Sequence, residues 1–146
     1  MKKLLCVLIF CLSFTYAFSW EVIVLKDEFG DSTGEKALIH KVGTTSMSLS
    51  DIKGYDRFIL AVKTTSGRAV TETRGIVKAK IDKSKPFALN CKILHGWGFI
   101  TDISREQLYL IANGKKIKFA ILNERKSYDV ITIDLIGLKK LIHEID

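Results

Sequence analysis

Residues 75–82, GIVKAKID, show the clearest alternation of apolar and polar side chains in the sequence. Successive side chains of an extended strand point to opposite faces. Val77, Ala79 and Ile81 would therefore face one way, and the lysines and the aspartate between them the other. One apolar face and one wet face are typical of an antiparallel sheet. This stretch predicts a fold built mainly of antiparallel strands.

The same period of two continues on both sides of this stretch, between segments rich in turn-forming residues. Ser66-Gly67 predicts a hairpin turn, and residues 27–35, with Gly30 and Gly34, predict a turn-rich loop. The further predicted strands are residues 20–25, 37–42, 45–49, 57–64, 68–74, 87–94, 97–101, 115–122 and 128–134.

The last third of the chain adds helical signals. Ser104 and Gln107 match a capping box that starts a helix. Asn113-Gly114 predicts its end, because glycine tolerates the left-handed conformation. After Gly137 a closing helix is predicted, whose apolar stripe comprises Leu138, Leu141, Ile142 and Ile145.

About nine short strands and two short helices predict a mainly β fold, either an antiparallel β-sandwich or an open barrel. The two helices would lie in the C-terminal third. A doubly wound α/β fold is not expected, since no strand is repeatedly followed by a long crossover helix.

The N-terminus, residues 1–19 (MKKLLCVLIFCLSFTYAFS), has the layout of a secretory signal peptide: a basic start, an apolar core and small residues before the cut. The apolar core is shorter than the roughly 20 residues of a membrane-spanning helix. We expect cleavage before Trp20, a single β-rich domain over residues 20–146 and a periplasmic or secreted location. No transmembrane span is expected after cleavage. An uncut leader would instead tether the protein by its N-terminus.

The net charge of the whole chain is +7, and of residues 20–146 +5, because the leader carries two lysines and no acid. The basic residues are spread over many segments, which predicts diffuse basicity. Such a charge fits weak attraction to anionic partners, such as phospholipid headgroups or acidic glycans. A nucleic-acid partner is not expected, because its footprint would cluster on one face or helix.

The acidic segment 27–35 (DEFGDSTGE) is the most distinctive candidate site. One interpretation is structural: Asp and Ser side chains bond nearby amides, and the glycines supply positive φ. The alternative is a weak calcium site at Asp27, Asp31 and Glu35, although the spacing is not that of an EF-hand. We predict no bound metal and no cofactor.

Cys91 is the single cysteine outside the leader, so the domain forms no internal disulfide; a buried thiol is expected. On a strand, Cys91 and His95 would lie about 13 Å apart, too far for a zinc or catalytic pair. His40 and His143 lack metal-ligand spacing, and His143 is expected to be solvated.

No nucleophile elbow, phosphate-binding loop or zinc-protease motif occurs. Trp97 and Phe99, flanked by glycines, form an aromatic patch. The expected role of the two rings is core packing. The glycines beside them are expected to mark a bulge or a close approach of the backbone. If the rings instead face outward, they would offer a platform for a sugar or a peptide.

Two resemblances add to these observations. Trp20 followed by Asp27-Glu28-Phe29-Gly30-Asp31-x-Thr33-Gly34-Glu35 resembles a group of small exported bacterial proteins with no assigned activity. The capped helix, strand, and strand ending in a Gly-apolar helix over residues 104–145 resemble the invasion-associated locus B and type VI secretion-associated TagO-like proteins. Members of this second group often carry a disulfide, which this domain cannot form. The resemblance implies an exported, disulfide-free, β-rich accessory domain and transfers no catalytic residue.

Together these features predict a non-enzymatic exported binding or envelope-accessory domain, whose partner would be a protein or another envelope component. Its candidate binding surface combines Asp27, Asp31 and Glu35 with Trp97 and Phe99. The alternative is a hydrolase of cell-wall or glycan substrate that uses the carboxylates of residues 27–35. An inhibitor of hydrolases is a third hypothesis, to which the positive charge is poorly matched because many such targets are basic.

Overall fold

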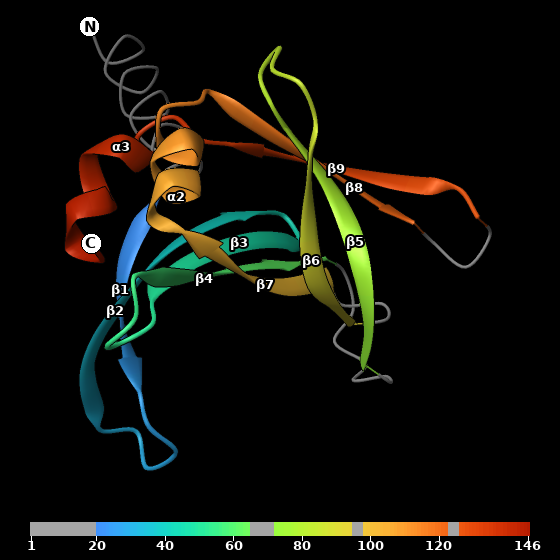
Figure 1. Ribbon diagram of the computed structural model, residues 1–146. Helices are drawn as coiled ribbons and strands as arrows, with labels where there is room; N and C mark the ends of the chain where they lie inside the picture. Colours follow the sequence, from blue (N-terminus) through green and yellow to red (C-terminus); the bar gives the residue numbers. More distant parts are fainter. Residues whose placement is uncertain (1–19, 65–71, 95–97, 123–125) are drawn as a thin grey trace, which may run out of the picture.

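The computed structural model describes residues 20–64, 72–94, 98–122 and 126–146 (Figure 1). α2 (Arg105–Ala112) lies between the seventh and eighth strands, and α3 (Leu138–Leu141) and the 3₁₀ turn η1 (Ile142–Glu144) follow the ninth. The strands are β1 (Glu21–Lys26), β2 (Ser32–Val42), β3 (Thr45–Asp51), β4 (Arg57–Lys63), β5 (Glu72–Ile81), β6 (Phe87–Leu94), β7 (Gly98–Ser104), β8 (Lys116–Leu122) and β9 (Tyr128–Asp134). The predicted mainly β fold with two short C-terminal helices is confirmed.

The nine strands of the described residues all belong to one antiparallel sheet, in the order β1-β2-β3-β4-β7-β6-β5-β8-β9. β4 pairs with β7, and β5 lies between β6 and β8. In the described part of the chain β1 and β9 are the two edges of the sheet and do not pair, so the sheet is not closed. It is a curled open sheet whose halves face each other, within the class that the sequence predicts.

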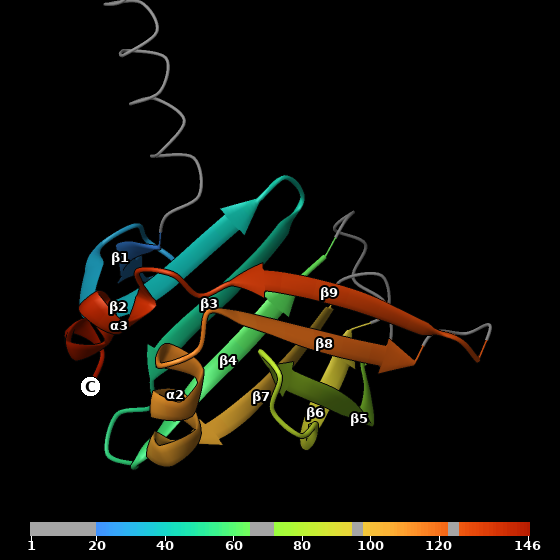
Figure 2. The same cartoon turned by 90° about the horizontal axis from the view of Figure 1, so that it is seen from above.

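The core lies between these halves. β8 and β9 lie above β3 and β4 in the first view (Figure 1) and cross over them when the sheet is seen from above (Figure 2). The rings of Phe99 on β7 and Phe119 on β8 meet edge to face, with centroids 5.1 Å apart. At one end of the core, the indole N–H of Trp20 donates to the carbonyl oxygen of Asp134, 3.0 Å away. Since Trp20 precedes β1 and Asp134 ends β9, this bond joins the two edge strands.

β5 has the two faces that the alternation predicts. Val77 and Ala79 are fully buried, whereas Lys78 and Lys80 are exposed. The strand is longer at its start than residues 75–82, since it begins at Glu72. The predicted hairpin turn at Ser66-Gly67 lies outside the described residues.

α2 starts with the predicted capping box. It also ends near Gly114 as predicted, but the reason for a glycine at that position differs from the one we expected. The Ser104 side chain accepts from the Gln107 amide, and the Gln107 side chain accepts from the Ser104 amide, which completes the capping box. Gly114 does not have the left-handed conformation that we expected. A Cβ there would lie 2.4 Å from Cγ2 of Ile81, so the position requires glycine for space.

The closing helix is short and buries the predicted stripe. Gly137, with φ 91°, precedes α3. Leu138, Ile142 and Ile145 are buried, and Leu141 packs partly against the same core.

Candidate functional site

The acidic segment folds as a turn followed by the start of β2. The carboxylate of Asp27 accepts bonds from the amides of Phe29 and Asp31, both at 2.9 Å. Gly30 and Gly34 have φ values of 85° and 74°. These are the interactions of the structural interpretation, which is confirmed. The predicted loop is shorter than expected, because residues from Ser32 onward belong to β2.

The three candidate calcium ligands have no common centre. Oε1 of Glu35 lies 3.0 Å from Nζ of Lys53, in the β3–β4 turn. Asp27 is engaged with turn amides, and among the described residues no three His, Cys, Asp or Glu side chains form a cluster able to hold a metal ion. The carboxylate of Asp27 therefore serves the turn, and that of Glu35 forms an exposed ion pair.

Phe99 is fully buried in the core and contacts Phe119. Its predicted core role is confirmed, and its ring does not face outward as a platform. Trp97 lies outside the described residues. Gly98 confirms the expected close backbone approach: its φ is 130°, and a Cβ there would lie 1.8 Å from the carbonyl oxygen of Val62. Because Phe99 is buried, it does not contribute to the candidate binding surface that we expected it to form with the acidic segment and Trp97.

Cys91 is buried, as predicted, and burial raises the pKa of its thiol. His95 lies outside the described residues. His143 is exposed, as expected, whereas His40 is buried and stacks on Trp20 with ring centroids 5.3 Å apart. Among the described residues neither ring nitrogen of His40 has a hydrogen-bond partner.

A polar cluster that sequence patterns did not reveal lies at the start of α2. The Arg105 guanidinium contacts the carboxylates of Asp56 and Asp146, and the Tyr109 hydroxyl also bonds Asp146. The hydrogen bond that Arg105 donates to Asp56 holds the pKa of Arg105 above its usual value, and the bond that the Tyr109 hydroxyl donates to Asp146 raises the pKa of Tyr109. The cluster fastens the C-terminal residue and the β3–β4 turn to α2.

Six of the 21 basic residues of the segment 20–146 lie together on one side of the sheet. We call the outward side of the neighbouring strands β6, β5 and β8 the basic face. Glu72 is the one acidic residue in these three strands. The face is formed by six exposed basic residues: Arg74, Lys78, Lys80, Lys92, Lys116 and Lys118.

Two like-charged pairs stand directly opposite each other on the basic face. Arg74 is aligned with Lys92 across β5 and β6, and Lys80 with Lys118 across β5 and β8. Cross-strand neighbours of equal charge destabilise a sheet. The basic residues are spread along the sequence as expected, and six of them come together on this face of the sheet.

A hollow of about 710 Å³ adjoins the basic face. The β6–β7 ladder pairs only three positions, from Leu94↔Gly98 to Lys92↔Ile100. Beyond them the strands separate, and the Thr101 hydroxyl bridges the gap by donating to the carbonyl of Asn90 at 2.7 Å. The hollow lies where the ladder stops, over an opening in the sheet.

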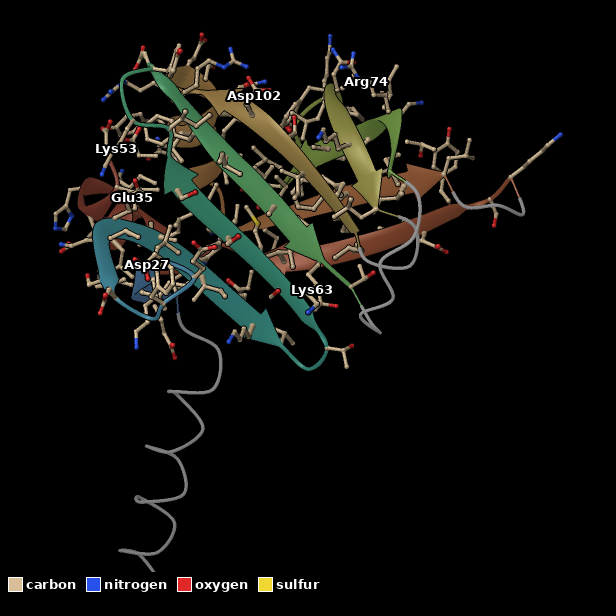
Figure 3. All side chains as sticks on the ribbon, turned by 90° about the horizontal axis from the view of Figure 1, so that it is seen from below. Asp27, Glu35, Lys53, Lys63, Arg74 and Asp102 are labelled. Atoms are coloured by element: carbon tan, nitrogen blue, oxygen red, sulfur yellow. The ribbon has the colours of Figure 1, made fainter. Side chains whose placement is uncertain are left out.

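The walls of the hollow are partly apolar and partly charged. Ile59, Ile76 and Ile100 contribute apolar side chains. Arg74 and Asp102 contribute charges, and the Asp102 carboxylate is paired with Arg57. In the part of the chain that the structure describes, no acid pairs with Arg74. Figure 3 shows Arg74 and Asp102 well away from Asp27 and Glu35, so the hollow and the acidic turn are separate regions.

Among the described residues no helix is both long enough and apolar enough to span a membrane.

No protein-family model and no curated protein matches the chain. Its fold is similar to that of the crystal structure of invasion associated protein B from Bartonella henselae, with a TM-score of 0.60 at 12% sequence identity. The alignment covers 88% of this chain and 92% of the other. At this identity the likeness shows the fold alone. It agrees with the locus B resemblance of the C-terminal layout, whereas the nine-residue motif and the TagO-like resemblance gain no further support.

Proposed function

We propose that the chain is an exported, non-enzymatic binding domain that docks an anionic component of the cell envelope on the basic face. The observation that carries this proposal is the gathering of six exposed basic residues on three neighbouring strands. Export is supported by the signal-like residues 1–19.

The like-charged pair Lys80/Lys118 gives a physical reason for this function. Lys80 opposite Lys118 reduces stability, by up to about 1 kcal/mol at exposed positions. An anionic partner would remove this repulsion and gain attraction from both lysines. The arrangement therefore costs stability in the free protein and favours the bound state.

The acidic segment is a weaker candidate for the binding site than the basic face. It is also a weak candidate for a hydrolytic site, because its interactions are those of a structural turn. The Asp27 carboxylate is already engaged with two turn amides, and Glu35 with Lys53. We therefore place the partner at the basic face and assign the acidic segment a structural role.

The test is retention of the full chain on immobilised heparin, used as a polyanion probe, as the salt concentration rises. The variant K80E/K118E removes one like-charged pair from the face. The variant K139E/K140E changes net charge equally, at exposed lysines of α3, which lies at the other end of the molecule (Figure 2). We expect K80E/K118E to elute at much lower salt, because it loses charges that contact the polyanion. K139E/K140E should elute close to the wild type, because its changed charges lie away from the bound polyanion and are screened by salt. Equal shifts in both variants would contradict a localised site.

A further inference from the structure

We propose that the anionic partner is the surface of a phospholipid bilayer, which the protein binds with the basic face and with an adjacent set of apolar side chains. This inference rests on the proposed function, because the basic residues supply the attraction. It adds the kind of partner, which the charges alone do not determine.

The apolar set is formed by exposed side chains on the outward side of β5, β8 and β9. We call it the apolar corner; its members are Ile76, Leu122, Tyr128 and Val130, which are 60%, 51%, 54% and 61% exposed. Leu122 is aligned with Tyr128, and Val130 with Ala120, across β8 and β9. Ala120 is in turn aligned with Lys78 of β5, which places the corner on the same side of the sheet as the basic face.

Cations and apolar groups are interleaved at this corner. Nζ of Lys78 lies 5.9 Å from the centre of the Tyr128 ring. The aligned lysines Lys80 and Lys118 lie one outward position further along β5 and β8. A bilayer interface can accept both kinds of side chain. Its anionic headgroups attract lysines with a free energy of about 1 kcal/mol each, and the region beneath the headgroups accepts apolar side chains.

The apolar corner is the feature that favours a bilayer over other polyanionic partners. An acidic glycan or a nucleic acid would satisfy the lysines but would leave Leu122 and Val130 in water. Aliphatic side chains more than half exposed gain free energy only where an apolar phase receives them. Tyrosine, with an apolar ring and a polar tip, is enriched at membrane interfaces.

The test is co-sedimentation of the exported protein, whose cleaved N-terminus is verified by mass spectrometry, with vesicles of phosphatidylcholine alone, and with vesicles that also contain phosphatidylglycerol. We expect binding to the anionic vesicles and at least about 30-fold weaker partition for K80E/K118E, which loses two lysine contacts and adds two repelled carboxylates. L122S/V130S removes exposed apolar side chains, so its fold should be unchanged by circular dichroism. This variant should lose about 10-fold or more of its vesicle partition while keeping its retention on heparin.

The outcomes separate this inference from the proposed function. Wild-type protein that is retained on heparin but does not bind anionic vesicles overturns the bilayer partner alone. So does wild-type vesicle binding that L122S/V130S leaves intact, or equal binding to neutral vesicles. Wild-type protein that binds neither heparin nor vesicles overturns both proposals.

Discussion

His40 is buried on β2 against Trp20, and neither of its ring nitrogens has a hydrogen-bond partner in the part of the chain that the structure describes. A buried polar group without a partner destabilises the folded state by about 1–3 kcal/mol. Stacking on Trp20 offsets part of this cost, because aromatic pairs contribute about 0.5–1.5 kcal/mol. The remaining cost makes this position one where an apolar residue would serve the fold better.

We therefore expect His40→Leu to raise the free energy of unfolding by about 1 kcal/mol, measured by denaturant titration at neutral pH. Leucine removes the unpaired nitrogens and keeps most of the buried volume. The control is His143→Leu at an exposed position, which should leave stability nearly unchanged. A clear loss of stability in His40→Leu would mean that the imidazole makes a favourable polar contact.

At the scale of elements, local signals predicted much of the structure. The capping box of α2 needs only Ser104 and Gln107, three residues apart, and it forms as expected. The alternation of Val77 and Ala79 with Lys78 fixed the inward face of β5. Each of these features depends on neighbours in sequence.

Features that depend on distant segments escaped sequence patterns. The order β6-β5-β8 brings Lys92 beside Arg74 and Lys118 beside Lys80, and no local period encodes that order. The basic face was therefore missed. Likewise, Gly114 is required because Ile81, 33 residues earlier in the sequence, occupies the space that a side chain would need.

Gly98 offers a test of the β4–β7 pairing. An alanine there would place its Cβ 1.8 Å from the Val62 carbonyl oxygen, at a φ of 130° that side chains rarely adopt. We expect Gly98→Ala to lower the free energy of unfolding by at least about 3 kcal/mol, or to prevent folding. Gly43→Ala is the matched control, with φ 58° and no atom within 4 Å of the added Cβ, and should cost only about 1 kcal/mol. Denaturant titration distinguishes the two, and equal effects would mean that the strands do not approach this closely.

At the scale of the whole molecule, an open sheet that encloses a core requires something to hold its two edges together. Trp20 supplies this connection, because it lies 4% exposed in the core, stacks on His40 of β2 and donates to the carbonyl of Asp134 at the end of β9. Trp20 is also the residue at which we expect the exported chain to begin. Removal of the leader would thus leave Trp20, which links the two edges of the sheet, at the new N-terminus.

Trp20→Ala should lower the free energy of unfolding by about 3–5 kcal/mol, the usual cost of truncating a buried tryptophan. Trp20→Phe keeps most of the packing and loses the hydrogen bond to Asp134, so it should cost about 1–2 kcal/mol. Phe29→Ala, at an aromatic residue that is 82% exposed, is the control and should have almost no effect. All three are measured by denaturant unfolding of protein whose N-terminus is verified by mass spectrometry. If Trp20→Ala unfolds at the wild-type denaturant concentration, the edges of the sheet are held together without Trp20. The graded loss from phenylalanine to alanine would instead show that both the ring and its N–H keep the open sheet wrapped around its core.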